Sequence, residues 1–385
     1  MVFILSFPVT LAAIVCALAT ACNAAYGSPG DPQQGFALEV ERIEPKVFIF
    51  GMFSAEGQAW YGIPEFNLLE RNISVPGFSL LYPDVHCTSS GSICQLVTGE
   101  GEINAVATVS ALIYSNLFDL RRTYFLIAGV AGISPKMATI GGVTFARFAV
   151  HVGLQFEIDA REVPAHFATG YIPQGAETPD QYPTRIYGTE VYELNDNLRR
   201  RAIDLANRAT LVDDKLSHIY RTKYASNPDH APALSRPSVV ACDTATSDQY
   251  WSGSLLAEAM ENVTRLLTNG TAEYCTSQQE DNATLEALLR AAVRGAVDFS
   301  RILILRTGSD FERPYEGQTA ADNLFHGLVG FASSIANLRL AGVQVVRGIV
   351  DEWEETYLEG VKADNYVGDI FGSLGGQPDF GPVKI

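Results

Sequence analysis

Short apolar runs alternate along the chain with longer segments whose apolar positions recur every three or four residues. The runs have the length of buried strands and lie at residues 46–51, 93–98, 124–129, 142–152, 239–243 and 301–306. The periodic segments predict helices at 104–115, 193–209, 254–268, 282–297 and 319–340. Strands that alternate with helices favour a mostly parallel sheet covered on both faces. We therefore expect one α/β domain over residues 46–350, with a central mixed, mostly parallel sheet flanked by helices.

Three segments stand outside this alternation. Residues 26–45 are polar and predict a linker, and residues 351–385 form a C-terminal tail. Residues 152–237 are polar, irregular and in places rich in proline, which indicates an insertion with one helix rather than a second core.

The first residues predict export. Residues 2–21 are almost wholly apolar and are followed by small residues up to Ala25, which is typical of a signal peptide over residues 1–25. The first basic residue is Arg42, so the usual positive charge before the apolar run is missing. An uncleaved membrane anchor is the alternative, because about 20 apolar residues span a bilayer. No later apolar run approaches that length, so we expect no membrane span after cleavage.

Cysteines and glycosylation motifs agree with a secreted or cell-surface protein. Behind the leader lie four cysteines, and the natural pairing joins Cys87 to Cys94 and Cys242 to Cys275, although three connectivities are open. Acceptor triplets for N-glycosylation occur at Asn72, Asn262 and Asn269, and also at Asn282.

Charge limits the partners. The 385 residues carry 44 acidic and 27 basic side chains, a formal net charge of −17. Such a surface repels phosphate backbones and anionic lipid, so nucleic acid is not expected as a partner. The cysteine spacing is wrong for zinc and the histidines form no ligand pair on a helix, so we expect neither a metal nor a cofactor.

Candidate chemistry lies at the ends of the predicted strands, because ligands of such sheets bind where the strands end and loops converge. These ends are the segments GMFSAE (51–56), TGEGE (98–102), AGVAG (128–132), DTATSD (243–248) and RTGSD (306–310). Together they hold several carboxylates and one arginine.

The order of these motifs resembles the nucleoside phosphorylase/nucleosidase superfamily, and within it the purine nucleoside permease family. The carrying segments are KVFIFGMFSAEGQAW (46–60), LVTGEGEINAVAT (96–108), FLIAGVAGISPKMATIGGVTFARF (125–148), ACDTATSDQYWSG (241–253), QQEDNAT (278–284) and LRTGSDFERP (305–314). The resemblance covers about residues 46–340, apart from the insertion. It implies a phosphorylase-like fold and a purine nucleoside as ligand.

The resemblance also implies roles for single residues. Asp310 matches the carboxylate that protonates purine N7, a step that stabilises the leaving base and needs an acid with a raised pKa. Glu56 and Arg306 match the pair that binds and activates water, and Glu280 the carboxylate that holds the ribose hydroxyls.

Five further positions are expected to contact the substrate by the same resemblance. They are Thr98, Gly129, Asp243, Thr244 and Ser309. For Asp310 and Glu56 a purely structural role is the simpler interpretation. Asp310 and Glu56 are also placed where acids favour helix N-termini.

Aromatic residues near the strand ends leave two interpretations open. Trp60, Tyr61, Tyr250 and Trp251 either stack on a purine or belong to the core.

Three activities remain in view. Hydrolysis of purine nucleosides to base and ribose is favoured, because the first and third strand-end segments contain no basic residue to hold phosphate. A phosphate-dependent phosphorylase is one alternative, and a permease-type protein that binds nucleosides for uptake without cleavage is another. The sequence leaves the oligomeric state open, a homo-oligomer included.

Overall fold

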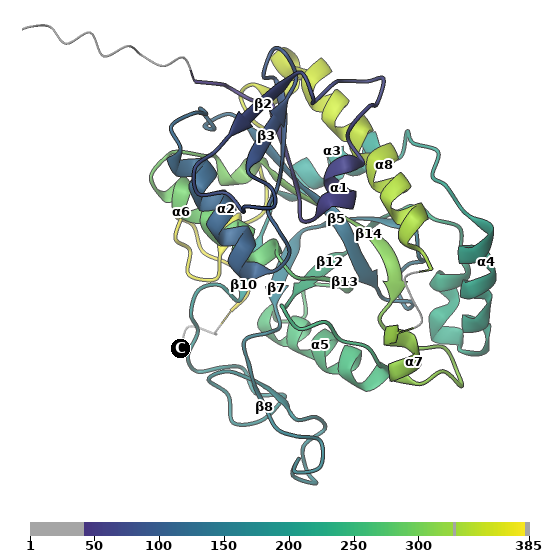
Figure 1. Cartoon of the computed structure of the whole chain (residues 1–385). Helices are drawn as coiled ribbons and strands as arrows, with labels where there is room; N and C mark the ends of the chain where they lie inside the picture. Colours follow the sequence, from purple (N-terminus) through teal and green to yellow (C-terminus); the bar gives the residue numbers. More distant parts are fainter. Residues whose placement is uncertain (1–41, 326–328, 382–385) are drawn as a thin grey trace, which may run out of the picture. The chain divides into compact units, whose positions relative to one another are not determined.

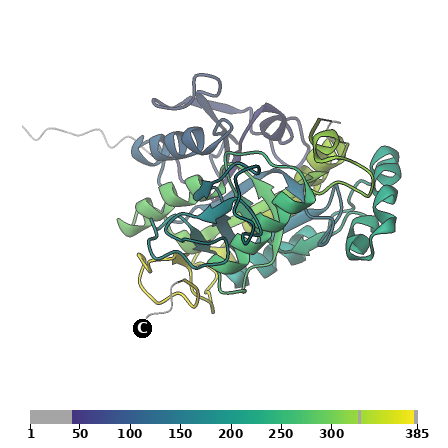
Figure 2. The same cartoon turned by 90° about the horizontal axis from the view of Figure 1, so that it is seen from below.

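Four parallel strands form the centre of the sheet in this computed structural model, which describes residues 42–325 and 329–381 (Figures 1 and 2). Strand β1 (Val47–Gly51) lies between β4 (Ile93–Val97) and β5 (Tyr124–Ile133), and β5 pairs in turn with β14 (Ile302–Phe311). The expected signal peptide and most of the expected linker lie outside the described residues.

Alternate residues of these strands enter two different cores, as the period of two along a strand requires. Phe48, Phe50 and Ile304 face one core, whereas Val47 and Ile49 face the other. Each strand is buried on both faces, which is why it appears in the sequence as a continuous apolar run.

Helices cover both faces. Helices α2 (Glu102–Tyr114) and α6 (Asp281–Val293) lie side by side over the first core (Figures 1 and 2). Helices α3 (Asp196–Ala206) and α8 (Phe331–Asp351) pack over the second. The prediction of a mixed, mostly parallel α/β sheet flanked by helices is thus confirmed.

A second group of strands continues the sheet beyond β5. Strand β13 (Tyr274–Gln278) is antiparallel to β5 and parallel to β12 (Asp243–Thr246), which is parallel to β7 (Phe148–His151). Helix α5 (Ser254–Leu267) packs against β7 and β13.

Further strands and short helices join these elements. The strands are β2 (Arg71–Ser74), β3 (Asp84–Cys87), β6 (Val143–Ala146) and β11 (Val239–Ala241). The short helices are α1 (Ser54–Gln58), α4 (Lys215–Arg221) and α7 (Ala320–Phe325), with 3₁₀ turns at Thr222–Ser226, Pro228–Leu234 and Phe299–Arg301.

Two strands are longer than the apolar pattern predicts. Strand β5 runs through residues 130–132, where a turn was expected, and β14 runs through residues 307–310, which were expected to follow the strand. The two strands pair along their whole length, from Ile302 opposite Phe125 to Phe311 opposite Ile133. This pairing extends both strands over small and polar residues, which the apolar pattern of the sequence does not predict as strand.

Other boundaries also differ from the prediction. The run at 142–152 is two strands, β6 and β7, and the run at 239–243 leads into two strands, β11 and β12. The predicted helix over 319–340 divides into α7 and α8. Residues 152–237 were expected to hold one helix but hold two, α3 and α4, and strand β13 was not predicted.

Two segments outside the predicted alternation each contribute one strand to the main sheet, and a hairpin in the first of them forms a separate two-stranded sheet. Residues 152–237 contain the hairpin β8 (Gln155–Glu157) and β9 (Tyr171–Pro173), together with β10 (Val191–Glu193). Strand β10 pairs with β7 and with β15 (Gly368–Asp369), which belongs to residues 351–385. A π-helical turn at Trp353–Tyr357 follows α8.

The structure joins Cys87 to Cys94 and Cys242 to Cys275, the pairing favoured from the sequence. Asn72, Asn262 and Asn269 are exposed, whereas Asn282 is buried and hydrogen-bonded to Thr246 and to the Thr189 carbonyl. Of the four acceptor triplets, Asn282 is therefore the one that a glycan cannot reach.

Among the helices of residues 42–325 and 329–381, none is long and apolar enough to cross a bilayer.

Candidate functional site

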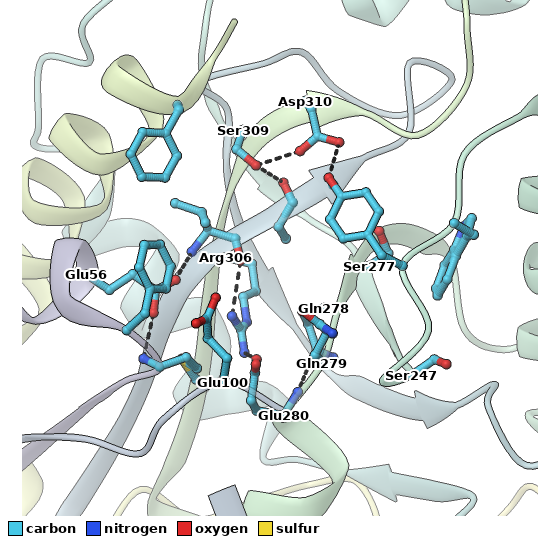
Figure 3. A pocket seen from close by; sticks show the side chains of 18 of the residues that line it. Glu56, Glu100, Ser247, Ser277, Gln278, Gln279, Glu280, Arg306, Ser309 and Asp310 are labelled. Atoms are coloured by element: carbon cyan, nitrogen blue, oxygen red, sulfur yellow. Dashed lines mark hydrogen bonds and ion pairs between the residues drawn. The ribbon is translucent and has the colours of Figure 1, made fainter. Parts of the chain in front are cut away.

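A cavity of about 310 Å³ opens where β5, β13 and β14 approach the start of α1 and the loop before α5 (Figure 3). Glu56, Arg306 and Asp310, the three residues expected to act in catalysis, all line it, as do Glu280 and Ser309. The other lining residues are Met52, Phe53, Glu100, Val130, Ala131, Gly132, Ser247, Gln249, Tyr250, Trp251, Ser277, Gln278, Gln279 and Phe331.

Glu56 is held in place by backbone groups of two elements. Its Oε2 accepts a hydrogen bond from the Met52 amide at 2.6 Å, and its Oε1 accepts one from the Val130 amide at 2.7 Å. The side chain is buried, and loss of hydration raises the pKa of Glu56 to about 7, although Arg306 and the two amides oppose that shift. The carboxyl therefore exchanges its proton near neutral pH in a fixed orientation.

Glu56 does lie in the first turn of α1, as the simpler interpretation supposed. The amide of Met52 precedes that helix, but the amide of Val130 belongs to β5. The carboxylate therefore connects two elements at the cavity wall, which is more than stabilisation of a helix end requires.

Arg306 is committed to other partners than Glu56. Its Nη2 lies 2.5 Å from Oδ1 of Asp281, and its Nε donates to Oδ2 of Asp281 at 3.3 Å. Its Nη1 donates to the Val130 carbonyl at 3.1 Å, and Oε2 of Glu280 lies 3.6 Å from Nη2. The buried guanidinium is thus neutralised mainly by Asp281, at the start of α6.

Gly129 explains how Glu56 and Arg306 come to lie next to each other. A Cβ atom on Gly129 would lie 2.5 Å from Oε1 of Glu56 and 2.6 Å from Nη1 of Arg306. No side chain at position 129 would fit beside these two groups. A glycine here therefore leaves the space that Glu56 and Arg306 fill.

Asp310 is directed into the cavity by an irregularity in β14. The register of β14 against β5 shifts between Gly308 and Asp310, and such bulges redirect side chains. Oδ1 of Asp310 receives a hydrogen bond from Ser309 Oγ at 2.7 Å, and Oδ2 receives one from Tyr250 Oη at 2.8 Å (Figure 3). Burial raises the pKa of Asp310, whereas these two donors lower it.

The position of Asp310 on a strand rules out the helix cap that was the simpler interpretation. The next helix, α7, begins ten residues later, at Ala320. The side chain bonds to Ser309 and Tyr250 instead of to a helix terminus.

Glu280 stands directly before α6. Its Oε1 accepts a hydrogen bond from the Gly101 amide at 3.0 Å, and burial raises the pKa of Glu280 while the charge of Arg306 lowers it. One carboxylate oxygen is therefore occupied by the backbone, and the other lies toward Arg306.

The charges that line the cavity are strongly unbalanced. Among the described residues that line it, the carboxyl groups of Glu56, Glu100, Glu280 and Asp310 face one guanidinium, that of Arg306. Asp281 already pairs with this guanidinium. The cavity therefore disfavours an anionic ligand and favours a ligand that is neutral or develops positive charge.

Four of the residues expected to bind substrate are not among those that line the cavity. Thr98 is buried and its hydroxyl hydrogen-bonds to the carbonyls of Gly51 and Gly99. Asp243 accepts bonds from the amides of Arg147, Phe148 and Glu273 at 2.8–2.9 Å. Thr244 accepts a bond from Gln278 Nε2 at 3.2 Å, and Gly129 lies behind Glu56.

The aromatic candidates divide into two groups. Tyr250 and Trp251 line the cavity, whereas Trp60 is fully buried in the core beside α8 and Tyr61 hydrogen-bonds to Gln95. Sequence reasoning missed Asp281, which it could have found beside Glu280 as a second acid at the start of a helix. It also missed the bond between Tyr250 and Asp310, for which the sequence carries no signal.

Over the two described ranges, no cluster of histidine, cysteine, aspartate and glutamate side chains is arranged to hold a metal ion.

Comparison with known proteins identifies relatives over nearly the whole chain. The purine nucleoside permease family model matches residues 44–362. A purine nucleoside permease of Candida albicans is 44% identical over 365 residues, which cover 93% of this chain and 86% of that protein. A probable purine nucleoside permease of Schizosaccharomyces pombe is 40% identical over 331 residues, covering 83% of this chain and 93% of the other.

Among solved structures, distant likenesses are found to nucleosidases. A 5′-methylthioadenosine/S-adenosylhomocysteine nucleosidase from Neisseria meningitidis is 15% identical, with a TM-score of 0.46 over 80% of this chain and 99% of the other. Futalosine hydrolase of Helicobacter pylori is also 15% identical, with a TM-score of 0.45 over 80% and 98%.

Proposed function

The chain belongs to the purine nucleoside permease family, and from this premise we propose that it hydrolyses the N-glycosidic bond of purine nucleosides to free base and ribose. One observation carries the proposal. A buried glutamate with a pKa of about 7, Glu56, shares a cavity with an aspartate whose pKa is also raised, Asp310. Figure 3 shows the two carboxyl groups apart from each other in the same pocket. Titratable groups tuned in this way are characteristic of acid–base catalysis.

In the proposed reaction Asp310 is the acid and Glu56 is the base. The bond between C1′ and the base nitrogen breaks, its electron pair goes to the base, and Asp310 gives its proton to purine N7. Water attacks C1′ and loses a proton to Glu56. The products are the neutral base and ribose, and the two carboxyl groups recover their starting states by proton exchange with solvent.

The other lining residues have supporting roles in this proposal. Glu280 accepts hydrogen bonds from the ribose hydroxyls, and Ser309 orients Asp310. Positive charge develops on the sugar as the bond breaks, and the surplus of carboxylates around the cavity stabilises it. Arg306, held by Asp281, opposes the rise that burial causes in the pKa of Glu56, so that part of Glu56 is ionised at neutral pH.

Hydrolysis is favoured over phosphorolysis by the charges at the cavity. Inorganic phosphate would have to enter among the four carboxyl groups that line the described part of the cavity, where Arg306 is already paired to Asp281. Phosphate recognition normally relies on arginine donors that are available to the anion. Water has no such requirement.

Binding for uptake without cleavage is the second candidate, because the relatives are named permeases. A protein that only binds has no use for a base of pKa about 7 held by two amides beside an acid. In that case another protein would carry the nucleoside across the membrane.

One experiment separates these functions. Base release from inosine, adenosine and guanosine is measured with the full chain, first in phosphate-free buffer and then with added phosphate. Equal release of base and free ribose in both buffers supports hydrolysis. Dependence on phosphate, with ribose 1-phosphate as product, indicates a phosphorylase. Binding without release supports the permease-type function.

We also propose that the protein is exported and acts outside the cell or at its surface. Both disulfides lie within the described residues, and Asn72, Asn262 and Asn269 are accessible to glycosylation. Mass analysis of the protein recovered from the medium should find an N-terminus near residue 26, and glycosidase treatment should lower its mass. An intracellular protein with an intact leader would contradict this proposal.

A further inference from the structure

The hydroxyl group of Tyr250 donates a hydrogen bond to one carboxyl oxygen of Asp310, the proposed catalytic acid. Tyr250 lies in the loop between β12 and α5, and its Oη donates to Oδ2 of Asp310 at 2.8 Å (Figure 3). The side chain lines the cavity and still exposes 55% of its surface. It is therefore a polar group at the cavity mouth that a ligand meets together with Asp310.

Ser309, the other donor to Asp310, is placed quite differently. It is buried, and its Oγ lies 2.7 Å from Oδ1 of Asp310 and 3.1 Å from the Ala131 carbonyl. Ser309 is thus fixed between protein groups. Tyr250, by contrast, is free to exchange its partner for a ligand.

We propose that Tyr250 is a specificity-determining residue that recognises the substituent at C6 of the purine and allows the site to accept 6-oxopurine as well as 6-aminopurine nucleosides. The inference rests on the proposed function, in which Asp310 meets purine N7. In the purine ring the substituent at C6 projects on the same side as N7. A group bonded to Asp310 therefore lies next to that substituent.

The two kinds of purine make opposite demands at this point. A 6-amino group is a hydrogen-bond donor, and a carboxyl oxygen of Asp310 accepts from it directly. A 6-oxo group is a hydrogen-bond acceptor, so its lone pairs repel those of a carboxylate. It therefore needs a hydrogen-bond donor between itself and Asp310. A phenolic hydroxyl both donates and accepts, so Tyr250 satisfies either substituent without a change of residue.

Other polar side chains nearby are less suited to this role. Ser277 and Gln249 also line the cavity, but within the described residues the carboxyl group of Asp310 accepts hydrogen bonds from Ser309 and Tyr250 alone. Burial, and after it other causes that include the charge of Asp310, raises the pKa of the neighbours Glu312 and Tyr224, and neither residue lines the cavity.

The test compares Tyr250→Phe with the wild-type chain on three substrates. These are inosine with a 6-oxo group, adenosine with a 6-amino group, and purine riboside with only hydrogen at C6. The readout is each kcat/KM relative to that of purine riboside, because any effect of the lost hydroxyl on Asp310 itself is common to all three. The matched control is Tyr114→Phe, an exposed tyrosine at the end of α2 whose ring Arg294 covers.

The variant should lower the ratio for inosine about tenfold, the effect expected for one lost hydrogen bond to a neutral group. The ratio for adenosine should fall less, and the control should change neither. An equal loss on all three substrates would mean that Tyr250 only orients Asp310, and would overturn the inference. Unchanged ratios would overturn it as well.

Failure of the proposed function gives a different result. If the wild-type chain releases no base from any nucleoside, hydrolysis is wrong, and the inference is then tested by calorimetry with the free bases hypoxanthine and adenine. A selective loss of hypoxanthine affinity in Tyr250→Phe supports recognition of C6. Equal losses, or no binding of either base to the wild-type chain, overturn it.

Discussion

Arg306 forms its closest ion pair with Asp281, 2.5 Å from Nη2 to Oδ1, and not with Glu56, the carboxylate beside which it lies. Both partners of this pair are almost fully buried. The charge of Arg306 therefore reaches Glu56 through space, while Asp281 fixes its position.

Asp281→Asn should destabilise the fold and abolish turnover. The substitution removes the closest ion partner of the buried guanidinium, and breaking one side of a buried pair costs about 3–5 kcal/mol. Chemical denaturation measures the free energy of unfolding. Asp351→Asn is the control, because it breaks a largely exposed pair with Arg347 and should cost less than about 1 kcal/mol. Equal effects of the two substitutions would contradict a central role for the buried pair.

Asp310→Asn should lose most of kcat on purine nucleosides while the protein still folds. An amide cannot protonate N7, and removal of a general acid typically slows a reaction about 10²- to 10⁴-fold. Circular dichroism checks the fold, and Asp351→Asn again serves as control, since its side chain is exposed. An unchanged rate would remove Asp310 from the proposed mechanism.

Glu56→Gln should abolish turnover but keep binding of adenine within about tenfold of the wild type, because the base itself needs no carboxylate at the position of water. The amide can accept only one of the two backbone bonds, from Met52 or Val130, so the unfolding free energy should also fall by about 1–3 kcal/mol. Steady-state kinetics and calorimetry distinguish the two effects. Intact turnover would indicate another arrangement of the nucleophile.

Turnover should fall as the pH is lowered through about 7, because the base must be ionised and burial raises the pKa of Glu56 to that value. Stability should change in the opposite direction. Between pH 4.5 and about 7 the folded protein keeps a proton on Glu56 that the unfolded chain gives up, so the free energy of unfolding decreases as the pH rises over this window. Turnover rates and denaturation curves measured over this pH range test both predictions. In Glu56→Gln the free energy of unfolding should depend less on pH over the same range.

Gly129→Ala should reduce turnover far more than stability. The new methyl group would lie 2.5 Å from Oε1 of Glu56 and 2.6 Å from Nη1 of Arg306, so one of these groups must move. The control is Gly348→Ala on α8, whose methyl group would lie 2.5 Å from Cδ2 of Leu205, in the core. The control should lose stability and keep its activity per folded molecule. If both variants behave alike, Gly129 matters for packing only.

The sequence determined the elements that build the sheet and the positions of the central candidates. Apolar runs bounded by small and polar residues reveal buried strands, and parallel strands bring their carboxyl ends to one edge. Strand ends that meet at one edge place Glu56, Arg306 and Asp310 near one another, and the resemblance to the family adds Glu280. All four line the cavity in the folded chain. Local spacing and compartment favoured one of three possible cysteine pairings, and the structure shows that pairing.

Only the tertiary structure decided which atoms of these residues meet. The extension of β5 and β14, and the bulge that directs Asp310, depend on pairing between residues almost 180 positions apart. The same holds for the bond from Tyr250 to Asp310 across 60 positions. Asp243, an apparent site residue at a strand end, proved to satisfy three backbone amides instead. Periodicity reports burial and local conformation, whereas hydrogen-bond partners and side-chain directions are fixed by distant segments, which a linear pattern does not contain.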